Sequence, residues 1–407
     1  MQKRTGRENG GEEGASEGKV SEPASGGERV EIVDVLRGVA ILGMLVANLE
    51  YFRTPEAWGG YGGTPSASTQ AYLFLEAFLA DGKFVTALSF LFGLGLAMQV
   101  RRSRDPGRAG TAFFMRRLLA LAAIGATHAL LVWSGDILLF YAALGVPFLL
   151  FVRLRPRVLV ACACAILGVW PLAGLTLAVI SFGGPEPASP SLALDGIARS
   201  AEAAYTSGSF REMTGQRVRE YLANLPPALL TSFPQIFSMM LLGAATANAG
   251  WVGGGSFGGR ARRAAVLGLA VGVPLNFFYA LPAGAGNGWY YLKLTAWLFG
   301  APIMALGWMG LVVFLQERFG LTSGRLAAVG RMALTNYLSQ SLILTTVFYW
   351  FGFYGNSPIE FAVGLMIGVW VLQILWSRPY LSRFGYGPVE WLWRRLSYGR
   401  LRNGSPR

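Results

Sequence analysis

The chain contains 407 residues, of which 53% are hydrophobic and 14% are charged, and its mean hydropathy is +0.43. A soluble domain carries about 25% charged residues, so this composition predicts an integral membrane protein. The net charge of +13 does not favour nucleic acid as a partner. Nucleic-acid-binding proteins gather basic residues on a soluble face, whereas here they stand in short clusters between apolar runs.

The first thirty residues are rich in Gly, Glu and Ser and contain no apolar stretch. We expect residues 1–30 to form a disordered cytoplasmic tail, not a signal peptide, because no apolar core precedes a cleavage site. The first membrane span would then direct insertion.

Ten apolar segments follow, and each is expected to cross the membrane as a helix, because lipid offers no partner to an open backbone. Several are shorter than the ~20 residues of a full crossing, and flanking aromatic residues would complete them. The predicted fold is an all-α polytopic membrane helix bundle with about ten transmembrane helices. The segments centre on Val35–Leu49, Phe84–Val100, Leu118–Trp133, Ile137–Val152, Val158–Ser181, Leu229–Ala249, Ala264–Leu281, Tyr290–Leu315, Met332–Phe351 and Ile359–Trp376.

The basic residues predict the orientation of this bundle. When the ten segments are threaded through a bilayer, 28 of the 35 Lys and Arg residues fall on one side. An excess of basic residues in short loops marks the cytoplasmic side, which faces anionic lipid. An even number of spans then places both termini in the cytoplasm. The seven exceptions are Arg53, Lys83, Arg199, Arg211, Arg217, Arg219 and Lys293.

A long outer loop divides the chain into two membrane parts. Residues 31–182 would form an N-terminal bundle of five spans, and residues 228–400 a second set of five spans with an interfacial helix. The loop itself, residues 183–227, contains an amphipathic stretch, Ile197–Leu225, which we expect to lie on the outer surface as a helix. Residues 401–407 would be a second disordered tail. One histidine and no cysteine cluster argue against a metal site.

Ionisable residues within the membrane are costly, so each is a candidate functional residue. Asp34 and Arg37 stand three positions apart at the head of the first span and can pair on one helix face. Asn48 lies eleven positions beyond Arg37, about three turns along the same face. Alternatively, Arg37 extends to the inner lipid headgroups and Asn48 packs between helices.

The only histidine, His128, precedes a tight turn at Ser134-Gly135, and Asp136 follows that turn. A carboxylate across such a hairpin could orient the imidazole and fix its tautomer, as in an acyl-transfer or proton-relay pair. This topology places His128 just below the outer surface. Asp136 could instead act only as a helix cap, and His128 could make an ordinary interhelical hydrogen bond.

Two further polar groups interrupt the apolar segments. Asp81 and Lys83, preceded by Glu76, stand at the expected outer start of the second span. They could line a polar vestibule with His128, or simply end and solvate a helix.

Asn336 and Gln340 form an i,i+4 stripe on the ninth span. Such a stripe faces either a substrate path or neighbouring helices that it holds together.

Three stretches carry a family resemblance. The opening VDVLRGVAILG (residues 33–43) and the hairpin from His128 to Ala142 resemble the YeiB-like bacterial membrane proteins. GRMALTNYLSQS (330–341) and FGYGPVEWLWR (384–394) resemble the C-terminal domain of unknown function 418 that defines that family. The resemblance implies a multi-pass protein of the bacterial cytoplasmic membrane, and it makes residues 228–400 the YeiB-like part.

The opening motif also resembles a broader group of transmembrane acyltransferases, including heparan-glucosaminide acetyltransferases and bacterial O-acyltransferases of surface polysaccharides. These enzymes pass an acyl group from cytoplasmic acyl-CoA to an acceptor on the far side. Asp34, Arg37 and Gly38 match the shared motif. Asn48 stands where the O-acyltransferases have a catalytic histidine, and the histidine that the heparan-type enzymes carry in the next loop is absent here. Either catalysis has moved to His128, or the scaffold no longer transfers acyl groups.

The resulting hypothesis is a membrane acyltransferase that moves an acyl group from cytoplasmic acyl-CoA to an extracytoplasmic sugar, lipid or envelope acceptor. His128 would be the general base or transient acyl carrier, held by Asp136. Arg37 and Asn48 would line the route, and the basic loop Arg101–Arg117 would bind the phosphates of the donor. The alternatives are a transporter of a small envelope precursor or anion, and a non-catalytic membrane protein.

Overall fold

The computed structural model describes residues 26–58, 64–102, 108–182, 191–253, 257–282, 286–320 and 324–398. Within these ranges every regular element is a helix, as the composition predicted. The α-helices are α1 (Gly26–Arg53), α2 (Ala67–Leu79), α3 (Lys83–Arg102), α4 (Arg108–Leu131), α5 (Leu138–Phe151), α6 (Pro156–Ser181), α7 (Ser191–Ser207), α8 (Phe210–Leu230), α9 (Ser232–Asn248), α10 (Phe257–Ala280), α11 (Asn287–Phe319), α12 (Gly324–Arg331), α13 (Ala333–Thr345), α14 (Ile359–Phe384) and α15 (Pro388–Tyr398). Short helices η1 (Pro55–Trp58) and η2 (Trp251–Gly253) join them, and a π-helical turn, η3 (Thr346–Trp350), continues α13.

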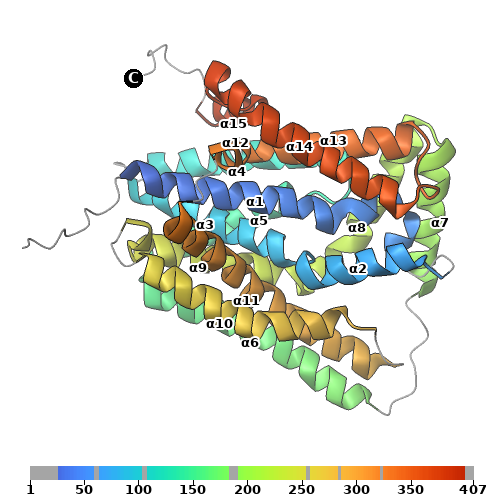
Figure 1. Ribbon diagram of the computed structural model, residues 1–407, viewed down its shortest axis with the longest axis horizontal. Coiled ribbons are helices and arrows are strands. Elements are labelled where there is room, and N and C mark those ends of the chain that lie inside the picture. The colour runs from blue at the N-terminus through green and yellow to red at the C-terminus, as the bar shows by residue number, and fades with distance from the viewer. Residues whose placement is uncertain are drawn as a thin grey trace, which may run out of the picture.

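Most of these helices lie side by side (Figure 1). In the view shown, α12–α15 lie along one side, α1–α5 occupy the middle, and α6, α10 and α11 form the opposite side. Helix α7 stands across one end, far from the start of α1 and from α15. We call the end with the start of α1 the inner end and the end with α7 the outer end, following the predicted charge orientation.

Seven helical segments of the described residues are long and apolar enough to cross a membrane, or eight if α8 and α9, bent by 58°, count as one span. The chain is therefore a multi-pass membrane protein. All ten expected segments are helical, but α5 has only 14 residues and α13 only 13. The count of ten spans and the cytoplasmic position of both termini thus stay predictions. Helix α1 begins at Gly26, so the last five residues of the expected tail, 26–30, are helical.

Contacts between helix ends show which of these ends lie at the inner end of the bundle and which lie at the outer end. At the inner end, the side chain of Asn248, the last residue of α9, donates to the carbonyl oxygen of Val152 just after α5, over 2.8 Å. At the outer end, the amide of Gly355 donates to the carbonyl oxygen of Arg53, also over 2.8 Å, and Phe182 packs edge-on against Trp289. These contacts fit a chain that runs back and forth between the two ends.

The outer loop differs from its prediction. The expected surface helix Ile197–Leu225 is instead two helices, α7 and α8, separated at Gly208 and Ser209. Ser209 starts α8 with a capping box shared with Glu212. Helix α8 buries Gln216, Arg217 and Glu220. The single-helix prediction was wrong because Gly208 and Ser209 divide the stretch. The polar face of α8 is also buried rather than exposed to water, since Glu220 binds Gln216 and Ser134 of the α4–α5 turn.

The second span also begins earlier than expected. Helices α2 and α3 together form one candidate span, Ala67–Arg101, and Asp81-Gly82-Lys83 is a short break within it. Gly82 adopts φ +76°, a conformation that favours glycine. The expectation that Asp81 and Lys83 mark the outer start of this span was wrong, because the apolar sequence of α2 extends the span beyond them.

Candidate functional site

His128, near the end of α4, and Asp136, just before α5, lie against each other as the hairpin predicted. His128 Nδ1 lies 2.7 Å from Asp136 Oδ2. The other carboxylate oxygen, Oδ1, accepts a hydrogen bond from the amide of Leu139 over 2.8 Å. Both side chains are 2% exposed or less. Asp136 therefore fills both predicted roles, since one oxygen holds the first turn of α5 and the other holds the imidazole.

The free side of the imidazole faces aromatic rings. The ring centroid of Tyr337, on α13, lies 5.3 Å from that of His128, and the Tyr337 hydroxyl donates to the carbonyl oxygen of Gly135 over 3.2 Å. Trp133 packs at 6.4 Å in a T-shaped arrangement. Within the described residues, His128 Nε2 is buried and has no hydrogen-bond partner. Because a carboxylate on Nδ1 favours the proton there, Nε2 presents an available lone pair.

The hairpin turn joins α4 to a short helix and is covered by α8. Helix α5 has 14 residues and is therefore about 21 Å long, shorter than the ~30 Å hydrocarbon core. Over the turn, Ser134 Oγ donates to Glu220 Oε2 on α8 across 2.6 Å. His128 thus lies behind a turn that α8 covers, and its depth below the outer surface stays a prediction.

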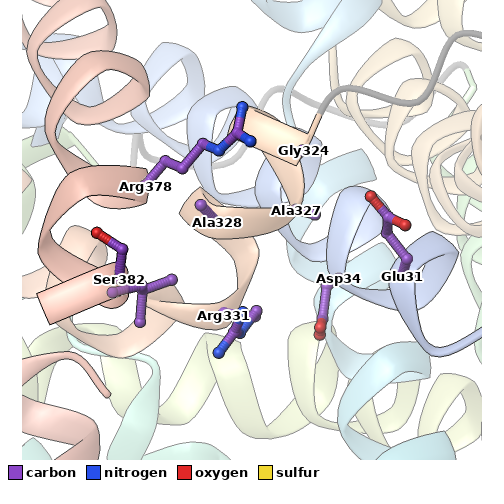
Figure 2. Close-up of a pocket in the computed structure, with 9 residues that line it drawn as sticks. Glu31, Asp34, Gly324, Ala327, Ala328, Arg331, Arg378 and Ser382 are labelled. Carbon is purple, nitrogen blue, oxygen red and sulfur yellow. The ribbon is translucent and has the colours of Figure 1, made fainter. Parts of the chain in front are cut away.

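Asp34 and Arg37 pair at the inner end, as predicted. Arg37 Nη1 lies 2.9 Å from Asp34 Oδ1. Asp34 also lines a cavity of about 520 Å³ between α1, α12 and α14. Figure 2 shows Glu31 and Asp34 on α1 facing the helices that carry Arg331 and Arg378. The cavity is lined by Glu31, Asp34, Gly324, Ala327, Ala328, Arg331, Arg378, Leu381 and Ser382.

The glycine of the opening motif has a packing role in this cavity wall. A Cβ atom on Gly38 would collide with the carbonyl oxygen of Leu326, and one on Gly330 would collide with the carbonyl oxygen of Asp34. These two glycines let α1 and α12 approach closely. No sequence pattern indicated that Glu31, Arg331 and Arg378 meet here, although Arg331 stands inside the C-terminal motif that also contains Gly330.

Asn336 and Gln340 are fully buried between helices. Asn336 Nδ2 donates to the carbonyl oxygen of Val329 over 3.0 Å, and Gln340 Nε2 donates to Gln373 Oε1 on α14 over 2.9 Å. Gln373 Nε2 in turn donates to the carbonyl oxygen of Asn336. These bonds fit the interhelical alternative better than a substrate path. Asn48 is half-buried and lies three turns from Arg37 along α1.

Lys83 is buried at the break between α2 and α3. Its ammonium group donates to the carbonyl oxygen of Ala77 over 2.5 Å and lies 5.6 Å from the centre of the Tyr279 ring. The Tyr279 hydroxyl donates to Asp81 Oδ2 over 2.7 Å. Among the described residues, these contacts lead to α2 and α10 and not to His128, so they do not support a vestibule shared with His128.

The expected donor loop Arg101–Arg117 is described only in part, since residues 103–107 lie outside the described ranges. Its last residue contacts the interfacial helix α15. The Arg117 guanidinium lies 4.2 Å from the centre of the Trp393 ring, and Trp393 Nε1 donates to the carbonyl oxygen of Arg117 over 2.9 Å. No group of three or more His, Cys, Asp or Glu side chains that could hold a metal occurs in the described ranges.

Comparison with known proteins places this architecture in a family. Residues 247–400 match the family described as protein of unknown function (DUF418). YeiB of Escherichia coli, an uncharacterized protein, is 34% identical over 390 residues, which cover 91% of this chain and 96% of the relative. YxaH of Bacillus subtilis, also uncharacterized, is 31% identical over 398 residues, 93% of this chain and 96% of the relative. The chain belongs to the YeiB-like DUF418 family. No solved structure matches it significantly.

The DUF418 match covers only part of the candidate site. It spans α10–α15, and so includes Arg331, Asn336, Gln340 and Tyr337. His128 and Asp136 precede it, in the part of the chain that the two relatives also cover. Tyr337 is therefore a residue of the DUF418 region that packs against the histidine at the hairpin.

Proposed function

We propose that this YeiB-like protein is a membrane acyltransferase that moves an acyl group from a cytoplasmic acyl-CoA to an extracytoplasmic sugar or envelope acceptor. One observation carries the proposal: the only imidazole of the chain is buried with Nδ1 held by Asp136 and Nε2 without a partner. A carboxylate that fixes the tautomer and stabilises the imidazolium is the arrangement that acyl-transfer bases require.

In the proposed step, His128 Nε2 takes the proton of an acceptor hydroxyl while the hydroxyl oxygen attacks the thioester carbonyl. A carbon–oxygen bond forms and the carbon–sulfur bond breaks. The coenzyme A thiolate leaves and receives the proton from His128, so the products are an ester and a free thiol. Asp136 stabilises the imidazolium throughout, since its carboxylate stays on Nδ1.

The donor would approach from the inner end. Phosphate groups favour arginine, and the inner cavity presents Arg331 and Arg378, with the loop Arg101–Arg117 as a further basic segment. Tyr337 stands only six residues after Arg331, across the break at Met332 between α12 and α13. This short separation supports a route along α13 from the cavity towards His128, with Arg37 and Asn48 on the neighbouring face of α1.

The test is the substitution His128→Ala in the purified full-length protein. We expect the release of free thiol from acyl-CoA in the presence of an envelope extract to fall by about 10²–10⁴-fold. Acyl-CoA should still raise the melting temperature, because the inner cavity is intact. A variant that keeps wild-type turnover would overturn the proposal, as would a wild-type protein that no acyl-CoA stabilises.

A transporter is the second candidate function. The break at Asp81-Gly82-Lys83 inside a membrane helix, with Lys83 buried, is the kind of interruption that lines midplane sites in carriers. Lys83→Met should abolish uptake into proteoliposomes if the chain is a carrier, while His128→Ala should leave uptake intact. A non-catalytic protein would show neither turnover nor uptake.

A further inference from the structure

Arg217 is a fully buried arginine without a counterion contact. Its side chain lies on the buried face of α8 and is 1% exposed. Its Nε and Nη1 atoms are buried and have no hydrogen-bond partner in the described residues. Burying a guanidinium that makes no compensating hydrogen bond or ion pair costs free energy.

The neighbouring carboxylate does not satisfy Arg217. Glu220 Oε2 accepts hydrogen bonds from Ser134 over 2.6 Å and from Tyr205 over 2.8 Å, and Oε1 accepts one from Gln216 over 3.1 Å. No ion pair within 4 Å joins Arg217 to any carboxylate of the described residues. The guanidinium instead faces the Tyr205 ring, with 5.9 Å to its centre.

A second unpaired donor belongs to the same packed cluster. Trp133 Nε1 is buried without a partner in the described residues, and Trp133 belongs to the same apolar cluster as Tyr205. Trp133 stacks on Phe52 at 4.1 Å and lies beside His128. Arg217 and Trp133 can only donate hydrogen bonds. A molecule that bound to both side chains would therefore have to supply acceptor atoms such as oxygens.

We infer that Arg217 and Trp133 form a binding site for an oxyanion, a phosphate or carboxylate group, beneath α7 and α8 at the outer end. Arginine suits both groups, because its planar guanidinium matches their oxygen geometry. Burial strengthens this interaction by excluding water.

The position of the site links it to His128. Ser134 binds Glu220 in the Arg217 cluster, and Asp136, two residues further, binds His128. An anionic molecule on Arg217 would therefore lie next to a cluster that is bonded to the same turn that holds the imidazole. That this molecule is the acyl acceptor rests on the proposed function, whereas the anion site itself does not.

The test measures thermal unfolding of the full-length protein in neutral detergent with inorganic phosphate, acetate or chloride at matched ionic strength. We expect a saturable rise in melting temperature of about 2–5 °C with phosphate, with acetate, or with both, and none with chloride. The oxyanion that acts at the lower concentration identifies the preferred group. Arg217→Gln should abolish the rise, and Trp133→Phe should weaken apparent affinity by about fivefold, equivalent to one neutral hydrogen bond.

Arg219→Gln is the matched control, because Arg219 is exposed on the same helix and should leave the response unchanged. Arg217→Met should unfold at or above the wild-type temperature without oxyanion, since it removes an unpaired buried charge. If Arg217→Gln does not fold, Trp133→Phe and Arg217→Met decide the question. A wild-type protein that responds to phosphate and acetate no more than to chloride would overturn the inference, as would variants that respond like wild type.

His128→Ala separates this inference from the proposed function. If the oxyanion response persists in His128→Ala while turnover is lost, both stand. An oxyanion response in a wild-type protein that transfers no acyl group supports the site alone. If the protein transfers acyl groups but shows no oxyanion response, the oxyanion site is contradicted and the proposed function is not.

Discussion

A single aspartate ties the start of α5 to the only histidine of the chain. Because Asp136 uses one oxygen for the amide of Leu139 and the other for His128, its structural and chemical roles can be separated. Asn at this position keeps an oxygen for the amide but removes the negative charge that stabilises an imidazolium. Ala removes both.

We therefore predict that Asp136→Asn lowers acyl transfer by about 10²–10⁴-fold while the protein keeps its helical content and melting temperature. Asp136→Ala should lose turnover and also some stability, because the first turn of α5 loses its partner. Thiol release and thermal unfolding of the two variants check this. Wild-type turnover in Asp136→Asn would show that the carboxylate has no chemical role.

Residue-level prediction succeeded where partners are close in sequence. His128 and Asp136 are eight positions apart across a turn, and Asp34 and Arg37 share one helix face, so spacing alone indicated both contacts. Arg217 and Glu220 lie more than eighty positions beyond Ser134, and no local pattern connects them. Asn336 and Gln340 were recognised as a stripe, but Gln373, which accepts from the Gln340 side chain and donates to the backbone carbonyl of Asn336, lies on another helix.

At the scale of elements, the start of α13 depends on a side chain from α15. Glu390 Oε1 accepts hydrogen bonds from the amides of Leu334 and Thr335 over 2.7 and 3.0 Å, and Oε2 pairs with the Thr335 hydroxyl. Burial raises the pKa of Glu390 above its ordinary value of 4.5, although the hydrogen bonds from Thr335 oppose the shift.

The sign of the pH dependence follows from that shift. Since the folded state holds the Glu390 proton more tightly than the unfolded state, its contribution to stability is complete below pH 4.5 and is lost as pH rises through the folded pKa. Glu390→Gln keeps an amide oxygen for the two backbone donors and cannot titrate. We expect the melting temperature of wild type to fall relative to Glu390→Gln as pH rises above 4.5. Parallel melting curves across this range would contradict the prediction.

Two glycines allow α3 and α9 to pack backbone to backbone. A Cβ atom on Gly243 would collide with the carbonyl oxygen of Phe90, and one on Gly93 would collide with the carbonyl oxygen of Met240. Small residues at such crossings hold membrane helices together by close contact.

Gly243→Ala should therefore lower the free energy of unfolding by about 1–3 kcal/mol, the usual effect of overpacking a core. Gly368→Ala on α14 is the control, because a Cβ atom there meets nothing within 4 Å. That control should be neutral or raise stability by up to about 1 kcal/mol. Chemical denaturation in detergent measures both, and equal values for the two variants would show that the α3–α9 contact tolerates a methyl group.

The elements themselves were largely predictable because apolar runs must be helical in lipid. All ten expected segments are helices. The errors fell on α2 and on α7–α8, where polar and apolar residues mix and hydropathy alone cannot separate a surface helix from a buried one. Burial there depends on partners that lie far away in the chain, α10 for α2 and the α4–α5 turn for α8.

On the scale of the whole molecule, two polar regions lie along the bundle, one at its inner end and one beneath α7 and α8. The inner cavity combines Arg331 and Arg378 with the opening motif, and the outer end covers His128 and Arg217 with α7 and α8. Helix α13 passes between them, with Asn336 facing α14 and Tyr337 facing His128. Such an arrangement suits a reaction whose two substrates arrive from opposite sides of a membrane.

The number of spans determines whether the inner and outer ends of the bundle face opposite sides of the membrane. Ten spans place both termini inside, but α5 and α13 are short enough that either could fail to cross. We expect Ser68→Cys and Asn356→Cys, in a background with Cys162 and Cys164 replaced by Ser, to react with a membrane-impermeant maleimide on intact cells. Arg157→Cys should react only after permeabilisation. All three positions are exposed, so the membrane alone would control access. If α5 does not cross, Arg157→Cys becomes reactive on intact cells. If α13 does not cross, Asn356→Cys is protected, and the substrates would have to meet from a single side.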